Sequence, residues 1–300
     1  MTSPNLQDPP QSTSTMTTTN KPEITLYWLN DSRAQRIVWL LEELDLPYTI
    51  KTFWRTSSGL APPELERIHP LGKSPVLAIS FPFEPHRKAI VLAESGFIVQ
   101  YLCDHFSPKR GRERLVPERW VKGKEGEMGG ETEGWMRHQY LLHYAEGSFA
   151  LTLVIGVVLS IFESKNIPFF IRPVTGFVAN KIYQAFVLPN AEKHIAFLDG
   201  MLATTSPSSE SSASEEGGRY LCGGFLTAVD ILLSFNLITT RDGVGKMMVS
   251  VGEKGKQEKI SLWEKYPRVG EYLERLQQEE GYLRAEETIK AVEGKQDKGE

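Results

Sequence analysis

The first clear pattern in the chain is a strand followed by a helix. Residues 24–29 are rich in β-branched and aromatic side chains, which predicts a strand. Residues 30–32 are Asn, Asp and Ser, which favour a turn or a helix cap. From residue 37 to residue 44 the apolar positions follow the i, i+3, i+4, i+7 spacing of one helix face. Ser32 is therefore expected at a strand-to-helix junction, where free N–H groups and the helix dipole favour an anion.

Alternating strand and helix patterns continue to residue 106. Further strand patterns occupy residues 48–53, 75–79 and 89–92, and helix patterns begin at residues 61–65 and 94–95. The proline-containing segment between the last two strands (FPFEPHRK) suits a hairpin. The order β-α-β-α-β-β-α predicts an α/β domain with mixed strand directions over residues 23–106.

After residue 106 the pattern becomes helical. Residues 107–134 are charged and Gly-rich, which predicts a linker, and residues 135–283 predict an all-helical domain. Within this domain, five apolar residues are expected to be buried: Phe177, Ile182, Phe186, Ile195 and Leu198. Pro189 is expected to kink its helix.

One apolar run, residues 149–162, needs separate interpretation. Its fourteen residues are fewer than the roughly 18 that indicate a bilayer-spanning helix. The run is therefore interpreted as a buried core helix, and no membrane span is predicted. Peripheral association with a membrane stays open.

Three segments lack the apolar groups needed to form a core. Residues 1–22 are rich in Ser, Thr and Pro and are predicted to be disordered. Residues 204–218 form a Ser-rich, low-complexity loop with the same prediction. Residues 284–300 are highly charged and are predicted to form a fraying tail.

Composition narrows the class of protein. With 300 residues and 40% hydrophobic content, the chain suits one large or two modest domains. The net charge is −4 and no basic stripe occurs, which argues against a nucleic-acid partner. Two cysteines, Cys103 and Cys222, and no signal peptide fit a reducing compartment, so a cytoplasmic location is expected.

Two further features look chemical at first sight. Thr227 and Asp230 have side chains of types that occur in catalytic sites, but their spacing before an apolar run is that of a helix capping box. His138 and His143 have no carboxylate at metal-ligand spacing. Neither feature is assigned a catalytic role, and no metal is predicted.

Several blocks, taken together in their order and spacing, resemble the glutathione transferases over about residues 24–283. They are WLNDSRAQRIVWLLEEL, APPELERIHPLGKSPVL and LAESGFIVQYL in the first half, and HYAEGS, RYLCGGFLTAVDILLSF and KYPRVGEYLERL in the second. The nearest pattern is that of the fungal Gtt-type subgroup. The resemblance implies a thioredoxin-like N-terminal domain, an all-helical C-terminal domain, glutathione as co-substrate and a homodimer.

The resemblance also implies a reaction, the attack of the glutathione thiolate on an electrophile. In this reaction the Ser32 hydroxyl donates a hydrogen bond to the thiolate. A thiol with a pKa of about 8.5 is mostly protonated at neutral pH. Lowering this pKa by about two units corresponds to about 2.7 kcal/mol, and one charge-assisted hydrogen bond contributes about 1.5–3 kcal/mol. A hydroxyl at a helix start is therefore sufficient in magnitude. The alternatives are that Ser32 is a plain helix cap, or that Asn30 or Arg33 takes its place.

Five further residues are implied in glutathione binding. Ser74, before a Pro75 expected to be cis, offers its backbone to the cysteinyl part. Glu94 and Ser95, at a helix start, match the γ-glutamyl ammonium and carboxylate. Lys73 and Arg55 are candidates for the glycyl carboxylate, with a solvated charge as the alternative for each.

The second-substrate pocket is predicted less sharply. Asn30, Tyr140 and Tyr144 are its candidates, with core packing as the alternative for the tyrosines. The expected activity is conjugation of glutathione to hydrophobic electrophiles in detoxification, together with peroxidase activity toward organic hydroperoxides. The alternatives are a transferase dedicated to a fungal secondary-metabolite pathway and a non-catalytic interaction module of the same fold.

Overall fold

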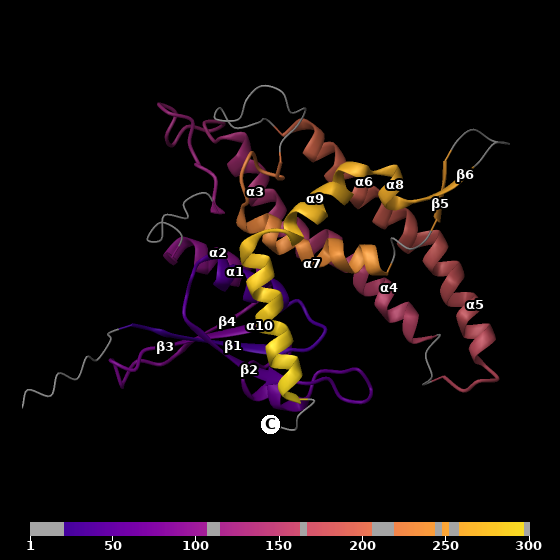
Figure 1. The fold of residues 1–300 in the computed structure, drawn as a ribbon, viewed down its shortest axis with the longest axis horizontal. Coiled ribbons are helices and arrows are strands. Elements are labelled where there is room, and N and C mark those ends of the chain that lie inside the picture. Colours follow the sequence, from indigo (N-terminus) through magenta and orange to yellow (C-terminus); the bar gives the residue numbers. More distant parts are fainter. Residues whose placement is uncertain are drawn as a thin grey trace, which may run out of the picture.

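The computed structural model describes residues 21–106, 115–162, 167–205, 219–243, 248–251 and 258–296. A small sheet domain at the N-terminal end lies beside a larger array of helices (Figure 1). The sheet domain and the helical domain agree with the two fold types that the sequence predicts. The predicted disordered tail (1–22), the Ser-rich loop (204–218) and the first part of the linker (107–134) fall largely outside the described residues.

The N-terminal domain contains one four-stranded sheet. Its elements are β1 (Glu23–Leu29), α1 (Gln35–Glu43), β2 (Tyr48–Phe53), a 3₁₀ helix (Pro63–Arg67), β3 (Val76–Ser80), β4 (Ile90–Ala93) and α2 (Ser95–Phe106). The strand order is β2-β1-β3-β4, with β2 parallel to β1 and the β3–β4 hairpin antiparallel. This arrangement confirms the predicted mixed sheet and places the end of β1 beside the start of β3.

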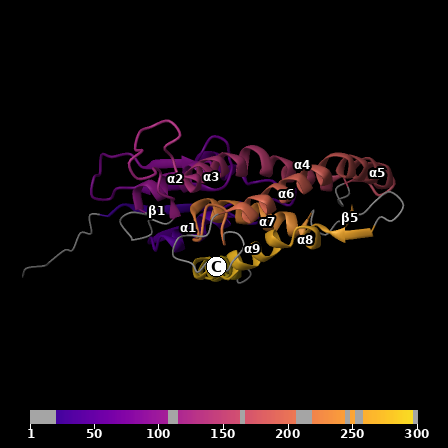
Figure 2. The ribbon, with the colours of Figure 1, turned by 90° about the horizontal axis from the view of Figure 1, so that it is seen from above.

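The described residues of the second half are helical apart from one small hairpin and short connecting loops. Its elements are α3 (Glu133–Tyr144), a π-helical segment (Ala145–Ala150), α4 (Leu151–Ile161), α5 (Arg172–Ile182), a second π-helical segment (Tyr183–Val187), α6 (Leu188–Thr204), α7 (Ala228–Asp242), β5 (Met248–Val251), β6 (Glu258–Ser261), α8 (Leu262–Lys265), α9 (Pro267–Gln277) and α10 (Glu280–Gln296). Figure 2 shows α7 running between α3, α4 and α6 on one side and α9 on the other. The predicted kink at Pro189 corresponds to the second π-helical segment, which ends just before it.

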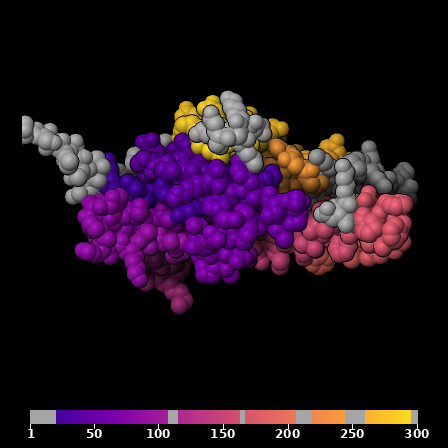
Figure 3. Space-filling view, turned by 90° about the horizontal axis from the view of Figure 1, so that it is seen from below, coloured from indigo at the N-terminus to yellow at the C-terminus, as the bar shows by residue number. Residues whose placement is uncertain are grey.

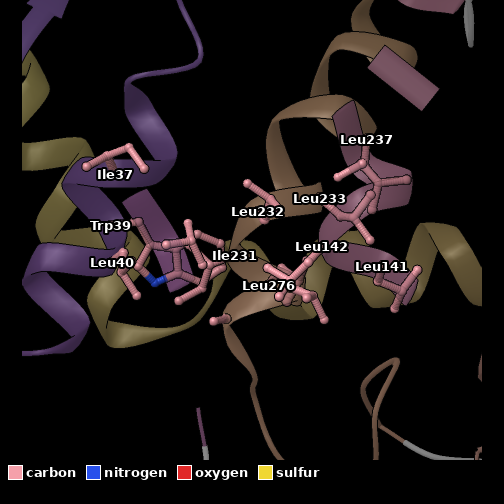
Figure 4. Packing of buried hydrophobic residues seen from close by; sticks show 14 of the residues in the cluster. Ile37, Trp39, Leu40, Leu141, Leu142, Ile231, Leu232, Leu233, Leu237 and Leu276 are labelled. Atoms are coloured by element: carbon pink, nitrogen blue, oxygen red, sulfur yellow. The ribbon is translucent and has the colours of Figure 1, made fainter. Parts of the chain in front are cut away.

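One continuous apolar core joins the two domains. Trp39 and Leu40 of α1 lie close to Ile231 and Leu232 of α7, and Leu141 of α3 extends the cluster (Figure 4). All of these side chains are almost completely buried. The position of α1, and with it the turn before α1, is therefore fixed by the helical domain as well as by the sheet.

Asp230 has the structural role that its spacing predicts. It accepts hydrogen bonds from the backbone N–H and the hydroxyl of Thr227 (2.7 and 2.5 Å), closing a capping box at the start of α7. The same carboxylate accepts from the Leu221 N–H (3.1 Å) and from the Tyr272 hydroxyl (2.5 Å). With these donors around it, Asp230 joins the start of α7 to α9 and is not available for catalysis.

The prediction that residues 149–162 form a buried core helix is wrong for much of α4. Leu151, Val154 and Val157 are 59%, 53% and 57% exposed, whereas Phe149 and Leu153 are buried. The helix lies at the edge of the bundle, so neighbouring helices cover one of its faces. An apolar sequence shows that a helix can be buried all round, but not how many neighbours it has.

Three burial predictions in the next helices are also wrong. Phe177, Ile182 and Phe186 are exposed, because α5 and the following π-helical segment lie at the outer edge and pack mainly against α4 and α6. The predictions for Ile195 and Leu198 are confirmed, since α6 turns back into the core and both side chains are fully buried.

The predicted fraying tail is instead most of α10. This helix packs along α1, where Tyr282 and Trp39 meet edge to face with ring centroids 5.2 Å apart. Ala285 is buried and Ile289 packs against the core, which gives α10 an apolar stripe. The apolar stripe was not predicted from the sequence because most residues of this segment are charged or polar.

His138 predicts a measurable pH dependence of stability. It is 3% exposed on α3, and neither ring nitrogen has a hydrogen-bond partner among the described residues. Burial lowers the pKa of His138 to about 4. Because the unfolded chain binds this proton near its ordinary pKa of about 6.5, acidification stabilises the unfolded state and native stability falls as pH drops from about 6.5 to about 4.

We expect His138→Leu to remove this loss. The stability of the variant relative to the natural chain should increase by about 2 kcal/mol between about pH 7.5 and about pH 5. Urea unfolding at the two pH values measures the difference. Identical pH dependence in both proteins would show that His138 has the same pKa in the native and the unfolded state, and would contradict the lowered native pKa.

Candidate functional site

The turn between β1 and α1 holds Ser32 at the predicted junction. Asp31 adopts a left-handed backbone conformation (φ 49°), which is uncommon for a residue with a side chain and is found where function constrains the backbone. The Ser32 hydroxyl oxygen accepts a hydrogen bond from the Ala34 N–H at 3.2 Å. This bond occupies a lone pair and leaves the hydroxyl proton for an acceptor, so Ser32 can cap the helix and donate to an anion at once.

Ser74 lies directly beside Ser32. The two hydroxyl oxygens are 3.5 Å apart, and the Ser74 hydroxyl donates to the Tyr27 carbonyl at 3.2 Å. The Ser74–Pro75 peptide bond is cis, as expected from the resemblance. The end of β1 and the start of β3 therefore meet at one corner of the sheet.

Glu94 and Ser95 form the third side of the same corner. Glu94 is exposed and has a left-handed backbone (φ 68°), and its carbonyl accepts the Ile98 N–H at 2.9 Å, so Glu94 caps α2. Ser95 is 2% exposed, and its hydroxyl oxygen accepts a hydrogen bond from Arg36 Nη2 at 3.2 Å. The Ser95 hydroxyl proton thus remains available to a carboxylate, next to the N–H groups that begin a helix.

The structure brings four of the predicted glutathione-binding residues into one depression. Its lining is Arg33, His69, Leu71, Lys73, Ser74, Pro75, Ala93, Glu94 and Ser95. Sequence reasoning did not identify His69 or Leu71 as part of this site, although both stand in the quoted block ERIHPLGKSP. The depression offers cations, an anion and helix-start donors within a short distance, a combination that fits a zwitterionic peptide.

A buried ionic network, also missed from the sequence, lies behind this depression. Arg36 is completely buried, and its guanidinium bonds the Glu146 carboxylate and the Leu232 carbonyl in addition to Ser95. The second oxygen of Glu146 bonds Arg33, which is about one-third exposed. Burial lowers the pKa of Arg36 to about 10 and the Glu146 carboxylate opposes this, so Arg36 stays charged at neutral pH.

The helical domain supplies the acid of this network through an irregular backbone. Glu146 stands in the π-helical segment between α3 and α4, a type of irregularity that is frequent at functional sites. Asn236 of α7 donates to the Ala145 carbonyl at 2.8 Å, which holds the segment in place. The sequence does give one signal for each charge, an Arg beside the apolar stripe of α1 and a lone Glu among apolar residues, but this signal does not show that the two charges pair.

Arg55 has a different role from the predicted one. Its guanidinium donates to the backbone carbonyls of Asn30, Asp31 and Gly59 at 3.1, 3.0 and 3.0 Å. These bonds commit the side chain to the turn that carries Ser32, and Arg55 is absent from the lining of the depression. The prediction that Arg55 binds the glycyl carboxylate is therefore replaced by a supporting role for the turn.

The three second-substrate candidates do not come together. The Asn30 side chain accepts the Arg55 N–H at 2.7 Å and donates to Asp31 at 2.8 Å, so it supports the turn. Tyr144 is buried and shares a hydrogen bond of 2.8 Å with His194, and exposed Tyr140 stacks on it with centroids 5.7 Å apart. The tyrosines thus belong to the α3–α6 contact, which is the packing alternative.

The two cysteines have the character of packing residues. Both are buried, and burial raises the pKa of Cys103 to about 12 and that of Cys222 even further. A thiol with so high a pKa is a poor nucleophile at neutral pH. Among the described residues, no group of three or more His, Cys, Asp or Glu side chains is placed to hold a metal ion.

Comparison with known proteins gives consistent matches. The family described as Glutathione S-transferase, N-terminal domain matches residues 32–105. Glutathione S-transferase 1 of Saccharomyces cerevisiae is 31% identical over 271 residues, covering 90% of this chain and 97% of its own length.

Solved structures agree with this match. A glutathione S-transferase from Actinobacillus pleuropneumoniae has a TM-score of 0.57 and 25% identity, with 88% of this chain and 92% of that chain covered. The glutathione transferase URE2P8 from Phanerochaete chrysosporium, solved with oxidized glutathione, has a TM-score of 0.59 and 15% identity, with 92% and 99% covered.

Proposed function

This chain belongs to the glutathione S-transferase family, and we propose that it uses Ser32 to activate glutathione for attack on hydrophobic electrophiles. It is a glutathione transferase, because 90% of its length matches a protein of that name. The observation that carries the proposal is the Ser32 hydroxyl. Its oxygen accepts the Ala34 N–H at 3.2 Å, and its proton faces a long contact of 3.5 Å with the Ser74 oxygen, which a thiolate would replace as the acceptor. A thiolate placed at this corner would receive one charge-assisted hydrogen bond and the favourable end of the α1 dipole.

We propose that particular residues of the depression bind particular ends of glutathione. Ser95 would bind the γ-glutamyl carboxylate through its hydroxyl and N–H, and Glu94 would bind the γ-glutamyl ammonium. The Ser74 backbone would pair with the cysteinyl residue, which brings the sulfur toward Ser32 because the two hydroxyls are 3.5 Å apart. Lys73, exposed on the rim of the depression, would bind the glycyl carboxylate.

The mechanism follows from these contacts. Binding of glutathione replaces water around the sulfur with the Ser32 hydroxyl, so the thiol loses its proton to solvent at a lower pH. The thiolate then attacks the electrophilic carbon and displaces the leaving group. With a hydroperoxide it attacks the outer oxygen instead, which breaks the O–O bond, releases the alcohol and leaves the sulfenic acid of glutathione. A second glutathione reduces that sulfenic acid, giving glutathione disulfide and water. Arg33, whose side chain lines the depression and is fixed by Glu146, adds positive charge on this side of the site.

The electrophile would lie against the start of α4. Leu151 and Val154 follow Glu146 by five and eight residues along the same continuous helix, and both are more than half exposed. At about 1.5 Å of rise per residue, their Cα atoms lie roughly 7–12 Å further along the helix axis than that of Glu146. This surface replaces Asn30, Tyr140 and Tyr144 as the proposed second-substrate site.

A simple assay separates the enzyme from a non-catalytic interaction module. The proposal predicts retention of the natural chain on immobilised glutathione together with turnover of a chloro-nitroaromatic substrate. Retention without turnover on a panel of electrophiles and hydroperoxides would favour the module instead. The same panel tests the peroxidase activity and a role restricted to one biosynthetic electrophile.

We also propose that the chain forms a homodimer in the cytoplasm. Val91 of β4, Phe97 of α2 and Met136 and Tyr140 of α3 are exposed apolar side chains on adjoining elements, and such clusters mark association surfaces. Sedimentation velocity tests the proposal, which predicts a species of twice the chain mass. A monomer at micromolar concentration would contradict it.

A further inference from the structure

The end of the α4–α5 hairpin is an exposed apolar lobe, defined here as residues 157–162 and 167–178. Its side chains include Val157, Ile161, Phe169, Phe170, Val174 and Phe177, which range from 51% to 79% exposed. In Figure 1 the hairpin extends away from the sheet domain, and in Figure 3 it forms one end of the molecule. Large exposed apolar side chains that gather on neighbouring segments mark an interaction site.

The described residues of the lobe carry exposed apolar side chains on both arms of the hairpin. Phe169 and Phe170 are consecutive, and their rings are perpendicular, with an interplanar angle of 89°. On α5, Val174, Phe177 and Val178 follow helical spacing and extend the apolar surface along the helix. Side chains that project in several directions from both arms suit a soft surface that surrounds them better than a flat, self-complementary protein face.

The charges on the described residues of the hairpin have one sign. Residues 151–162 and 167–187 contain no Asp or Glu, and their charged residues are Arg172 and Lys181. The connecting residues, Glu163 to Asn166, contribute one acidic and one basic residue and leave the net charge unchanged. The Lys181 ammonium lies 5.5 Å from the centroid of the Phe177 ring, so a cation stands beside the apolar surface. Aromatic side chains with adjacent cations match an apolar layer bounded by anionic headgroups.

We propose that the apolar lobe attaches the protein to the surface of a membrane that contains anionic lipid. Phe169 and Phe170 enter the boundary of the acyl chains, and Lys181 lies at the level of the headgroup phosphates. A second copy of the chain is the less suitable occupant, because the proposed dimer surface around Phe97 and Met136 lies on other elements.

The attachment is peripheral, although one helix has the composition of a membrane span. Within the described residues, the continuous helix Glu133–Ile161 is the one helix long and apolar enough to cross a bilayer, and 39% of the relevant window is buried inside the protein. Arg137 near its start bonds α6 backbone, and Glu146 in its middle bonds Arg33 and Arg36. These contacts keep the helix within the fold and leave its far end, in the lobe, for the lipid.

Sedimentation of the intact protein with vesicles tests the attachment. We expect the natural chain to bind vesicles of equimolar phosphatidylcholine and phosphatidylserine. The double variant Phe169→Ser, Phe170→Ser should bind on the order of a hundredfold less, because each phenylalanine that enters the apolar layer contributes about tenfold or more. Met128→Ser is the matched control, since Met128 is fully exposed outside the lobe, and it should bind as the natural chain does.

The contribution of the cation is tested separately. Lys181→Gln should weaken binding to the mixed vesicles about fivefold and leave the weaker binding to pure phosphatidylcholine unchanged. Amide hydrogen exchange of the natural chain gives a readout that needs no variant. Residues 167–178 should exchange more slowly when mixed vesicles are added, while residues 115–130 should not change.

Several results would overturn the proposal. These are absence of vesicle binding by the natural chain, unchanged binding by the double phenylalanine variant, or slowed exchange that spares residues 167–178. A lower sedimentation coefficient of the free protein in the double variant would show that another protein chain covers the lobe. Turnover of a water-soluble electrophile should be equal in all these variants, which separates a failed attachment from a failed enzyme assignment.

Discussion

Replacing Ser32 by alanine is expected to lower the turnover of a chloro-nitroaromatic substrate by roughly 10- to 100-fold at neutral pH. The substitution removes one hydrogen bond to the glutathione thiolate, and such a bond contributes about 1.5–3 kcal/mol. The glutathione KM should stay within a few-fold, because Ser74, Glu94 and Ser95 still hold the rest of the tripeptide. Steady-state kinetics with varied glutathione measures both quantities.

Ser74→Ala is the matched control for this experiment. Its hydroxyl lies 3.5 Å from that of Ser32 but donates to the Tyr27 carbonyl. Turnover should therefore change no more than a few-fold, since the proposed contact with glutathione uses the Ser74 backbone. Equal losses in the two variants would show that the corner has been disturbed as a whole, and an unchanged Ser32→Ala rate would reduce Ser32 to a helix cap.

Glu146→Gln is expected to lower the free energy of unfolding by about 3 kcal/mol. The change removes the carboxylate that faces Arg36, which is completely buried, and leaves that guanidinium without its counter-ion. The value is at the lower end for a broken buried pair because Glu146 is one-fifth exposed. Glutathione KM should rise as well, since Arg36 also holds the Ser95 hydroxyl. Urea unfolding and steady-state kinetics measure the two effects.

Glu84→Gln provides the comparison. Glu84 pairs with Arg87 at 3.0 Å, but both side chains are nearly half exposed, and such pairs contribute about 0–1 kcal/mol. Its unfolding midpoint and its glutathione KM should match those of the natural chain. If Glu146→Gln unfolds at the same urea concentration as Glu84→Gln, the network does not join the two domains energetically.

The N-terminal domain could be predicted almost completely from sequence because its signals are local. The apolar stripe of α1, the strand composition of β1 and the capping residues at Glu94 and Ser95 each depend on a few neighbouring residues. The position of Ser32 follows from the same local pattern. The resemblance then gave the roles of Ser74, Glu94 and Ser95, and the structure places these residues in one depression.

The residues that sequence reasoning misplaced depend on tertiary neighbours. Arg55 and Lys73 look alike as loop cations next to a strand, but it is Arg55 whose guanidinium donates to the carbonyls of Asn30 and Asp31. Glu146 and Arg36 are 110 residues apart, and no local pattern indicates that they meet. Their pairing becomes visible only when α1 and the π-helical segment are placed side by side.

The prediction of burial on the helical hairpin was wrong for a related reason. Apolar composition predicted that residues 149–162 and Phe177 are buried, yet α4 and α5 lie at the edge of the bundle. Conversely, the many charges after residue 284 concealed the apolar stripe of α10. Composition reports what a helix is able to contact, and the arrangement of its neighbours decides what it does contact.

The most direct test of the account is the titration of the glutathione sulfur while it is bound to the protein. The thiolate absorbs in the ultraviolet, so difference spectra over a range of pH give its pKa in the complex. The account predicts a pKa about two units below the value of about 8.5 for a free thiol, and a return toward that value in Ser32→Ala. A bound sulfur that titrates at the same lowered pKa in both proteins would contradict the assignment of Ser32.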